Sequence, residues 1–171
     1  MTNEPDPKDV AVAELLDDGH LEIDLADPPT RAELAVPDGR KTFIIEDEGK
    51  EPFRVTVTFS DGHVLEADRA SFVSVETDGS SDPTRLVIGM LNLTLDEMTT
   101  LLRRDAEQFG IEEDRLNSFL RDATAAEEGD LFTRSNFQAK GIAAPEFLEV
   151  TGILDGTAAD SQVNYIVEWK K

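Results

Sequence analysis

The spacing of apolar residues changes twice along this chain of 171 residues, and that change most restricts the folds it can adopt. In the first half, apolar and polar residues alternate, most regularly over 53–59, which predicts half-buried strands. Between residues 94 and 126 the apolar residues recur at helical spacing, and after residue 146 the alternation returns. Because the intervening turns are too short for repeated βαβ crossovers, this order predicts an α+β fold.

We expect a mostly antiparallel β-sheet with a two-helix hairpin, over about 94–126, inserted before the last two strands. Thr94 and Glu97 match a capping box at the start of the first helix, Gly110 marks its end, and Gly129 ends the second helix. The predicted strands cover residues 21–25, 42–46, 53–59, 63–67, 71–77, 85–91, 146–154 and 163–169. The pattern over 132–138 is ambiguous.

The N-terminal residues 1–9 are polar and contain two prolines, so we expect a disordered lead-in followed by a single domain over 10–171. Asp17-Asp18-Gly19 separates two apolar stretches and indicates a hairpin between them. No apolar run approaches the length of a membrane span, so we expect no membrane insertion. The N-terminus lacks a signal pattern, which favours a cytoplasmic protein; an exported protein whose signal has been removed is the alternative.

Acidic side chains number 37 and basic ones 16, which gives a formal charge of −21. A field of this sign repels nucleic acid and attracts basic proteins, so we expect no nucleic acid and a basic protein as partner. An acidic surface adapted to high salt is an alternative origin of the same composition. The acidic runs that we select as a possible interaction surface are Glu46, Asp47, Glu48, Glu112, Glu113 and Asp114.

Motifs for catalysis or cofactor binding do not stand out. The chain has no Cys, no Gly-rich phosphate loop and no serine in a nucleophile-elbow sequence. His20 and His63 would form a metal site only with carboxylates such as Glu22 or Glu66, and nothing in the sequence brings them together. The loop 78–82 offers oxygens to calcium but lacks the central Gly and closing Glu of an EF-hand. We therefore expect no cofactor, no metal and no enzymatic activity.

The helical pair has one recognisable spacing. Ala106, Gly110, Ile111 and Leu116 are placed in a way that is similar to the helix-turn-helix pattern of DNA-binding proteins. The second helix would then bring the carboxylates of 112–114 toward the phosphate backbone, which the charges oppose. We interpret the pair instead as a hairpin that packs both apolar stripes on the sheet.

The sequence thus predicts a non-enzymatic, highly acidic, soluble protein that acts as an interaction module for a basic partner. A small-molecule carrier or accessory domain, with an apolar pocket between sheet and helices, is the alternative. An enzyme that uses clustered carboxylates with a divalent ion is a third possibility, which no spacing supports. The side chains that would line the apolar pocket also suit a hydrophobic core; they are Leu95, Met98, Leu101, Leu102, Phe109 and Phe119.

Overall fold

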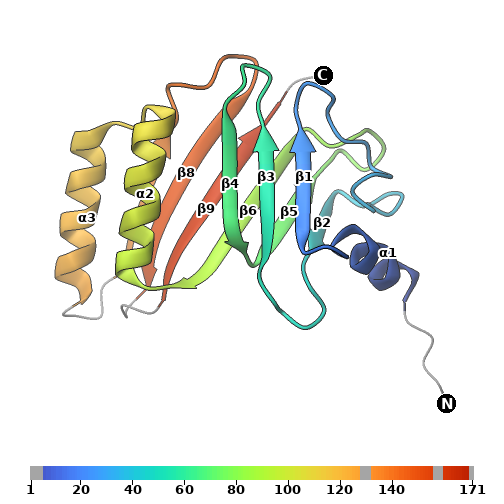
Figure 1. Ribbon diagram of the computed structural model, residues 1–171, viewed down its shortest axis with the longest axis horizontal. Helices are drawn as coiled ribbons and strands as arrows, with labels where there is room; N and C mark the ends of the chain where they lie inside the picture. Colours follow the sequence, from blue (N-terminus) through green and yellow to red (C-terminus); the bar gives the residue numbers. More distant parts are fainter. Residues whose placement is uncertain (1–5, 128–131, 156–159, 170–171) are drawn as a thin grey trace. The chain divides into compact units, whose positions relative to one another are not determined.

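The computed structural model describes residues 6–127, 132–155 and 160–169. These residues form an α+β fold with three helices and nine strands, mostly in antiparallel pairs, and two consecutive helices precede the last three strands (Figure 1). The predicted fold class is confirmed. The sequence placed only two strands after the helices because the pattern over 132–138 was ambiguous, and this segment forms a strand.

The chain divides into two compact units, residues 1–88 with 169–171, and residues 89–168. The single domain expected over 10–171 stays a prediction. Among the described residues, no helix combines the length and the apolar character needed to cross a membrane.

The first unit begins with helix α1 (Pro7–Leu15), where the sequence indicated a lead-in and then a hairpin. The Asp6 side chain caps this helix by accepting a hydrogen bond at 2.9 Å from the backbone N–H two residues later, and Pro7 stands at the first helical position. Val12 and Leu16, four residues apart, are both buried. The predicted hairpin was wrong because these helix signals outweigh the local Asp-Gly signal.

Two sets of strands complete the first unit. β3 pairs with β4 in antiparallel and with β1 in parallel orientation, which gives the order β1-β3-β4 (Figure 1). β2 pairs antiparallel with β5 and is the terminal strand of its sheet. The strands are β1 (His20–Asp24), β2 (Thr42–Ile45), β3 (Phe53–Thr58), β4 (Val64–Ala70), β5 (Phe72–Glu76) and the first part of β6 (Arg85–Leu93).

Arg31 holds the long loop between β1 and β2 in place. Its guanidinium donates hydrogen bonds to Thr77 Oγ1, at 2.8 Å, and to the carbonyl oxygen of Pro37. Its backbone N–H donates to Asp82 Oδ1 at 3.0 Å. One half-buried residue therefore ties this loop to the segment that follows β5, which explains how a long stretch without regular structure is kept in place.

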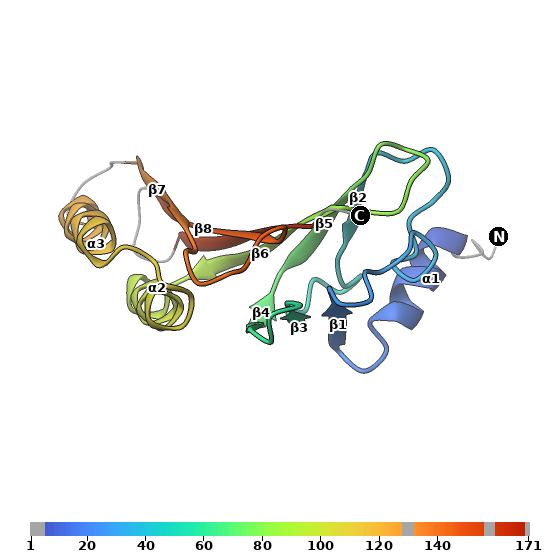
Figure 2. The ribbon, with the colours of Figure 1, turned by 90° about the horizontal axis from the view of Figure 1, so that it is seen from above.

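The second unit pairs a helical hairpin with an antiparallel sheet. β8 pairs with β7 on one side and with β9 on the other. α3 contacts β7, whereas α2 contacts β8 and β9, so both helices cover the same face of these strands (Figure 2). The elements are the second part of β6, α2 (Leu95–Phe109), α3 (Glu113–Glu127), β7 (Phe132–Gln138), β8 (Phe147–Asp155) and β9 (Ser161–Glu168).

Both predicted ends of α2 are confirmed. Thr94 Oγ1 accepts a hydrogen bond from the Glu97 N–H at 3.1 Å, and the Thr94 N–H donates to Glu97 Oε2 at 2.8 Å. Gly110 follows the helix with φ 68°, a conformation that glycine adopts without strain. Gly129, which we expected at the end of α3, lies outside the described residues.

We expect Thr94→Ala to lower the free energy of unfolding by about 1 kcal/mol, because it removes the acceptor for the Glu97 N–H. Thr94→Ser keeps a hydroxyl and should retain most of the stability. Thr100→Ala, at an exposed position of the same helix, is the matched control and should not destabilise, since alanine favours helices more than threonine does. Urea unfolding followed by circular dichroism measures these differences, and equal losses in the alanine and serine variants at 94 would contradict the cap.

Candidate interaction surface

The side chains predicted to line an apolar pocket lie on the two helices of the second unit. Five of the six are buried and Leu101 is half-buried. Gly152 of β8 lies directly beneath them: a Cβ atom there would be 2.7 Å from Phe119 Cε1 and 3.0 Å from Leu102 Cδ1. At this point the helix side chains contact the strand backbone. The apolar pocket between sheet and helices stays a prediction.

Asp105 is the charged residue among the buried positions of α2. The Tyr165 hydroxyl of β9 donates a hydrogen bond to Asp105 Oδ2 at 2.7 Å, and Arg104 Nη2 lies 3.0 Å from Asp105 Oδ1. Burial raises the pKa of Asp105, while Tyr165 and Arg104 partly oppose that change. Burial, followed by the nearby carboxylate, raises the pKa of Tyr165 well above its ordinary value.

This cluster was missed in the sequence, although a signal was present. Asp105 follows Leu102 by three residues and precedes Phe109 by four, so it stands within the apolar stripe of its helix. Perturbed carboxyl and phenol groups often mark functional sites. Here both side chains are fully buried, and the cluster satisfies polar atoms inside the packed core.

The two histidines lie beside opposite ends of β3, one in β1 and the other just before β4. His20 stands level with Arg54 at the start of β3, whereas the His63 carbonyl accepts a hydrogen bond from the Phe59 N–H just beyond its end. Arg54 and Phe59 are five residues apart, which at the rise of a β-strand separates the two ends by roughly 17 Å. His20 Nδ1 lies 3.7 Å from Glu22 Oε1. Within residues 6–127, 132–155 and 160–169, no group of three His, Cys, Asp or Glu is placed to hold a metal ion.

The loop that the sequence offered to calcium is an Asx-type turn. Asp78 Oδ1 accepts hydrogen bonds from the backbone N–H groups of Ser80, at 2.8 Å, and Ser81, at 2.6 Å. The Ser81 hydroxyl, followed by these N–H groups, lowers the pKa of Asp78. Asp82 in turn accepts the backbone N–H of Arg31. Protein donors therefore occupy the oxygens that a cation would need.

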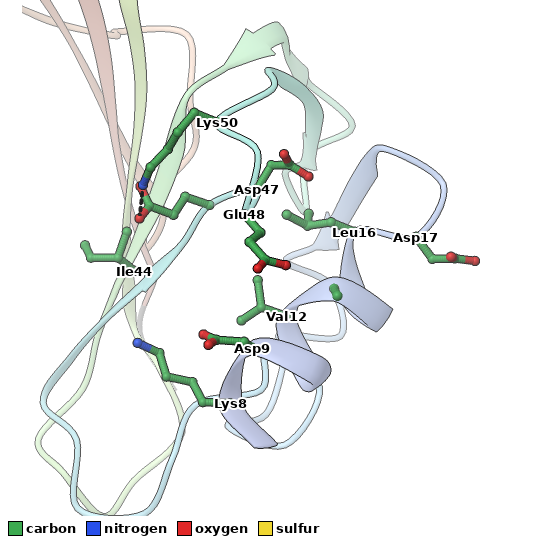
Figure 3. Close-up of a pocket in the computed structure, with 11 residues that line it drawn as sticks. Lys8, Asp9, Val12, Leu16, Asp17, Ile44, Asp47, Glu48 and Lys50 are labelled. Atoms are coloured by element: carbon green, nitrogen blue, oxygen red, sulfur yellow. Dashed lines mark hydrogen bonds and ion pairs between the residues drawn. The ribbon is translucent and has the colours of Figure 1, made fainter. Parts of the chain in front are cut away.

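A groove of about 510 Å³ runs between α1 and the segment that begins at β2 (Figure 3). Its apolar lining includes Val12 of α1 and Leu16, which directly follows α1, each 8% exposed, and Ile44 of β2, which is 41% exposed. Ile44 is exposed because β2 alternates, so that Phe43 and Ile45 face the core and Ile44 faces outward. The groove thus offers uncovered apolar surface beside a terminal strand.

Carboxylates surround this apolar surface. They come from Asp9 of α1 and from the predicted acidic run 46–48, while Asp17 lies at the edge of the groove with its side chain directed away from the others (Figure 3). In the part of the chain that the structure describes, Asp9, Asp17 and Glu48 make no side-chain hydrogen bond or ion pair. Three of the six residues of the predicted acidic interaction surface therefore line this groove.

The two lysines of the groove are already engaged. Lys50 Nζ lies 2.5 Å from Glu46 Oε1, and Lys8 Nζ lies 5.3 Å from the centroid of the Phe43 ring. The first contact is an exposed ion pair and the second a cation–π contact. Neither lysine neutralises the carboxylates of Asp9, Asp17 and Glu48.

The other predicted acidic run belongs to the second unit. Glu112, Glu113 and Asp114 are exposed where α3 begins, and the last two stand in its first turn. Acidic side chains there stabilise the positive end of the helix dipole. Glu112 Oε2 also lies 3.7 Å from Lys140 Nζ. These carboxylates thus have a local structural role in addition to their charge.

The residues with helix-turn-helix spacing adjoin a second pocket, of about 470 Å³, which Ala106, Ile111 and Leu116 line together with charged side chains. The turn between the helices contacts the loop that follows β7: the Gly141 N–H donates a hydrogen bond to the Phe109 carbonyl oxygen at 2.9 Å. The absence of nucleic acid binding stays a prediction based on charge.

Comparisons of the chain with protein-family models, with curated proteins and with solved structures find no match. Function is therefore inferred from the charge, burial and contacts of the chain's own residues.

Proposed function

We propose that the protein is a non-enzymatic interaction module that binds a basic protein. The observation that carries this proposal is the formal charge of −21, with 37 acidic against 16 basic side chains. Complementary charge accelerates the encounter of two proteins and penalises partners of the same sign. A basic protein is the partner class for which this surface is suited.

The placement of polar groups supports the same proposal. The carboxylates of Asp9, Asp17 and Glu48 in the first unit, and of the run 112–114 in the second, are exposed. Asp105, whose pKa is raised, is fully buried and therefore out of reach of a substrate. Exposed carboxylates of this kind suit the binding of a positively charged partner.

Affinity capture at two salt concentrations tests this function. The immobilised protein should retain basic proteins at about 20 mM salt and release them at about 0.5 M, where electrostatic interactions are screened within a few ångströms. An unrelated protein of similar size and charge serves as the control, and proteins retained by both are discounted. Each specific partner is then purified and titrated, and an affinity that ignores salt would refute the electrostatic basis of binding.

A stability measurement on the isolated protein distinguishes recognition of a basic partner from adaptation of the acidic surface to high salt. If the acidic surface serves recognition, the chain folds in about 50 mM salt and molar KCl raises its unfolding free energy only modestly. A protein that folds only in molar salt would instead assign the acidic surface to adaptation.

A further inference from the structure

We propose that the groove between α1 and β2 is the docking site, and that its occupant is a basic segment of a partner protein that places one apolar side chain between Lys or Arg residues. This inference rests on the proposed function and specifies where and how binding occurs. Its basis is the coincidence of available carboxylates with uncovered apolar surface in one concave site.

Charge identifies the sign of the occupant. Five carboxylates line the groove against two lysines, Lys8 and Lys50, which the Phe43 ring and Glu46 already engage. Asp9 and Glu48 are left as acceptors, so that a Lys or Arg side chain gains charge-assisted hydrogen bonds there, and Asp17 adds negative charge at the edge of the groove. A neutral or acidic segment would leave these carboxylates uncompensated.

Apolar surface identifies the second feature of the occupant. Ile44 is 41% exposed, and it lies across the groove from Val12 and Leu16 (Figure 3). A volume of about 510 Å³ accommodates an apolar side chain together with the aliphatic stems of neighbouring basic residues. The same geometry disfavours a purely polar basic segment, because Ile44 would stay exposed to water.

The groove is favoured over the acidic run 112–114 for a physical reason. Glu113 and Asp114 stabilise the start of α3, and Glu112 approaches Lys140. Asp17 and Glu48 have no such contact among the described residues. Their negative charge is therefore fully available to a partner.

Two labelled synthetic peptides test the proposal, Lys-Arg-Leu-Lys-Arg and the same peptide with Ser in place of Leu. Binding is measured by fluorescence polarisation at about 20 mM salt, and the contact surface is mapped by amide chemical-shift changes in the full chain. We expect the Leu peptide to bind about three- to tenfold more tightly than the Ser peptide, because one buried apolar side chain contributes about 1 kcal/mol or more. The shift changes should concentrate in residues 8–17 and 44–50.

Matched charge variants separate the groove from the general field. Asp17→Lys with Glu48→Lys should weaken binding of the Leu peptide about tenfold or more, since both substitutions place positive charge beside the groove. Asp68→Lys with Asp122→Lys makes the same change in net charge at exposed positions outside the groove, and should weaken it about threefold or less. Circular dichroism confirms that both double variants are folded.

Ile44→Ser provides the variant for the apolar contact. It should abolish the preference for the Leu peptide, because it removes the exposed apolar side chain that the leucine would contact. If the preference persists in this variant, the apolar part of the proposal is wrong.

The possible outcomes separate failure of the docking-site proposal from failure of the proposed function. Salt-sensitive peptide binding with shift changes elsewhere, for example at 112–114, or equal losses in the two charge variants, would overturn the groove and leave the acidic module intact. No binding of either peptide, together with no basic partner in the capture experiment, would overturn both.

Discussion

Asp105→Ala is expected to lower the free energy of unfolding by about 2–4 kcal/mol, a large fraction of the stability of a typical domain. The Tyr165 hydroxyl donates to Asp105 Oδ2 at 2.7 Å, and both side chains are fully buried. Alanine leaves that hydroxyl without its acceptor and leaves a void where the carboxylate was. Arg104 loses a partner too, but its side chain is 37% exposed and reaches water.

A double-mutant cycle isolates this hydrogen bond. Tyr165→Phe removes the donor, and the combination of Asp105→Ala with Tyr165→Phe should destabilise less than the sum of the two, by about 1 kcal/mol or more. Asp122→Ala, at an exposed position of α3, is the control and should have no measurable effect. Urea unfolding followed by circular dichroism, with amide exchange in β9, reports the change. Additive losses in the cycle would show that the two side chains do not interact.

Asp105→Asn allows a second test of this site, which is the pH dependence of the free energy of unfolding. Burial raises the pKa of Asp105 above its ordinary value of 3.8, so the folded protein binds this proton at a pH where the unfolded chain has lost it. The folded protein therefore loses stability as the pH rises from the pKa of Asp105 in the unfolded chain through its pKa in the folded protein. Below the unfolded pKa this loss is absent. Asparagine does not titrate. The stability of the parent relative to this variant should rise as the pH falls from 7 toward 4, and a constant difference would contradict the raised pKa.

The local elements were predictable because their signals lie within a few residues. The alternation of Phe53, Val55 and Val57 places one face of β3 in the core, and the Thr94 capping box starts α2 where expected. Pairing between distant segments was not predictable. β1 pairs in parallel with β3, and nothing in either strand encodes that partner.

The candidate sites, too, were predictable from the sequence only where the signal was local. The acidic run 46–48 was found from composition, but its groove was not, since α1 was interpreted as a lead-in and part of a hairpin. The helix signal was present in Asp6 and Pro7. Asp105 lies on the buried face of α2, and Tyr165 lies on the buried face of β9. A buried tyrosine needs an acceptor, and a carboxylate within the facing stripe was the available candidate.

Gly152→Ala is expected to lower the free energy of unfolding by about 1–3 kcal/mol through overpacking. Its Cβ atom would lie 2.7 Å from Phe119 Cε1, 2.9 Å from Phe119 Cζ and 3.0 Å from Leu102 Cδ1. Carbon atoms in favourable contact are about 3.5–4.0 Å apart. The Phe119 ring has little room to retreat, because it is 4% exposed and packs edge-on against Phe137 at a centroid distance of 5.7 Å.

Phe119→Leu is the compensating variant, since it removes the ring atoms that the new methyl group meets. The combination of Gly152→Ala with Phe119→Leu should destabilise less than the sum of the single variants, measured by urea unfolding. The same experiment decides between a packed core and the carrier alternative, because an apolar pocket between sheet and helices would accept one methyl group at no cost. Unchanged stability of Gly152→Ala would therefore favour the pocket, whereas a loss relieved by Phe119→Leu means that α2 and α3 close directly on β8.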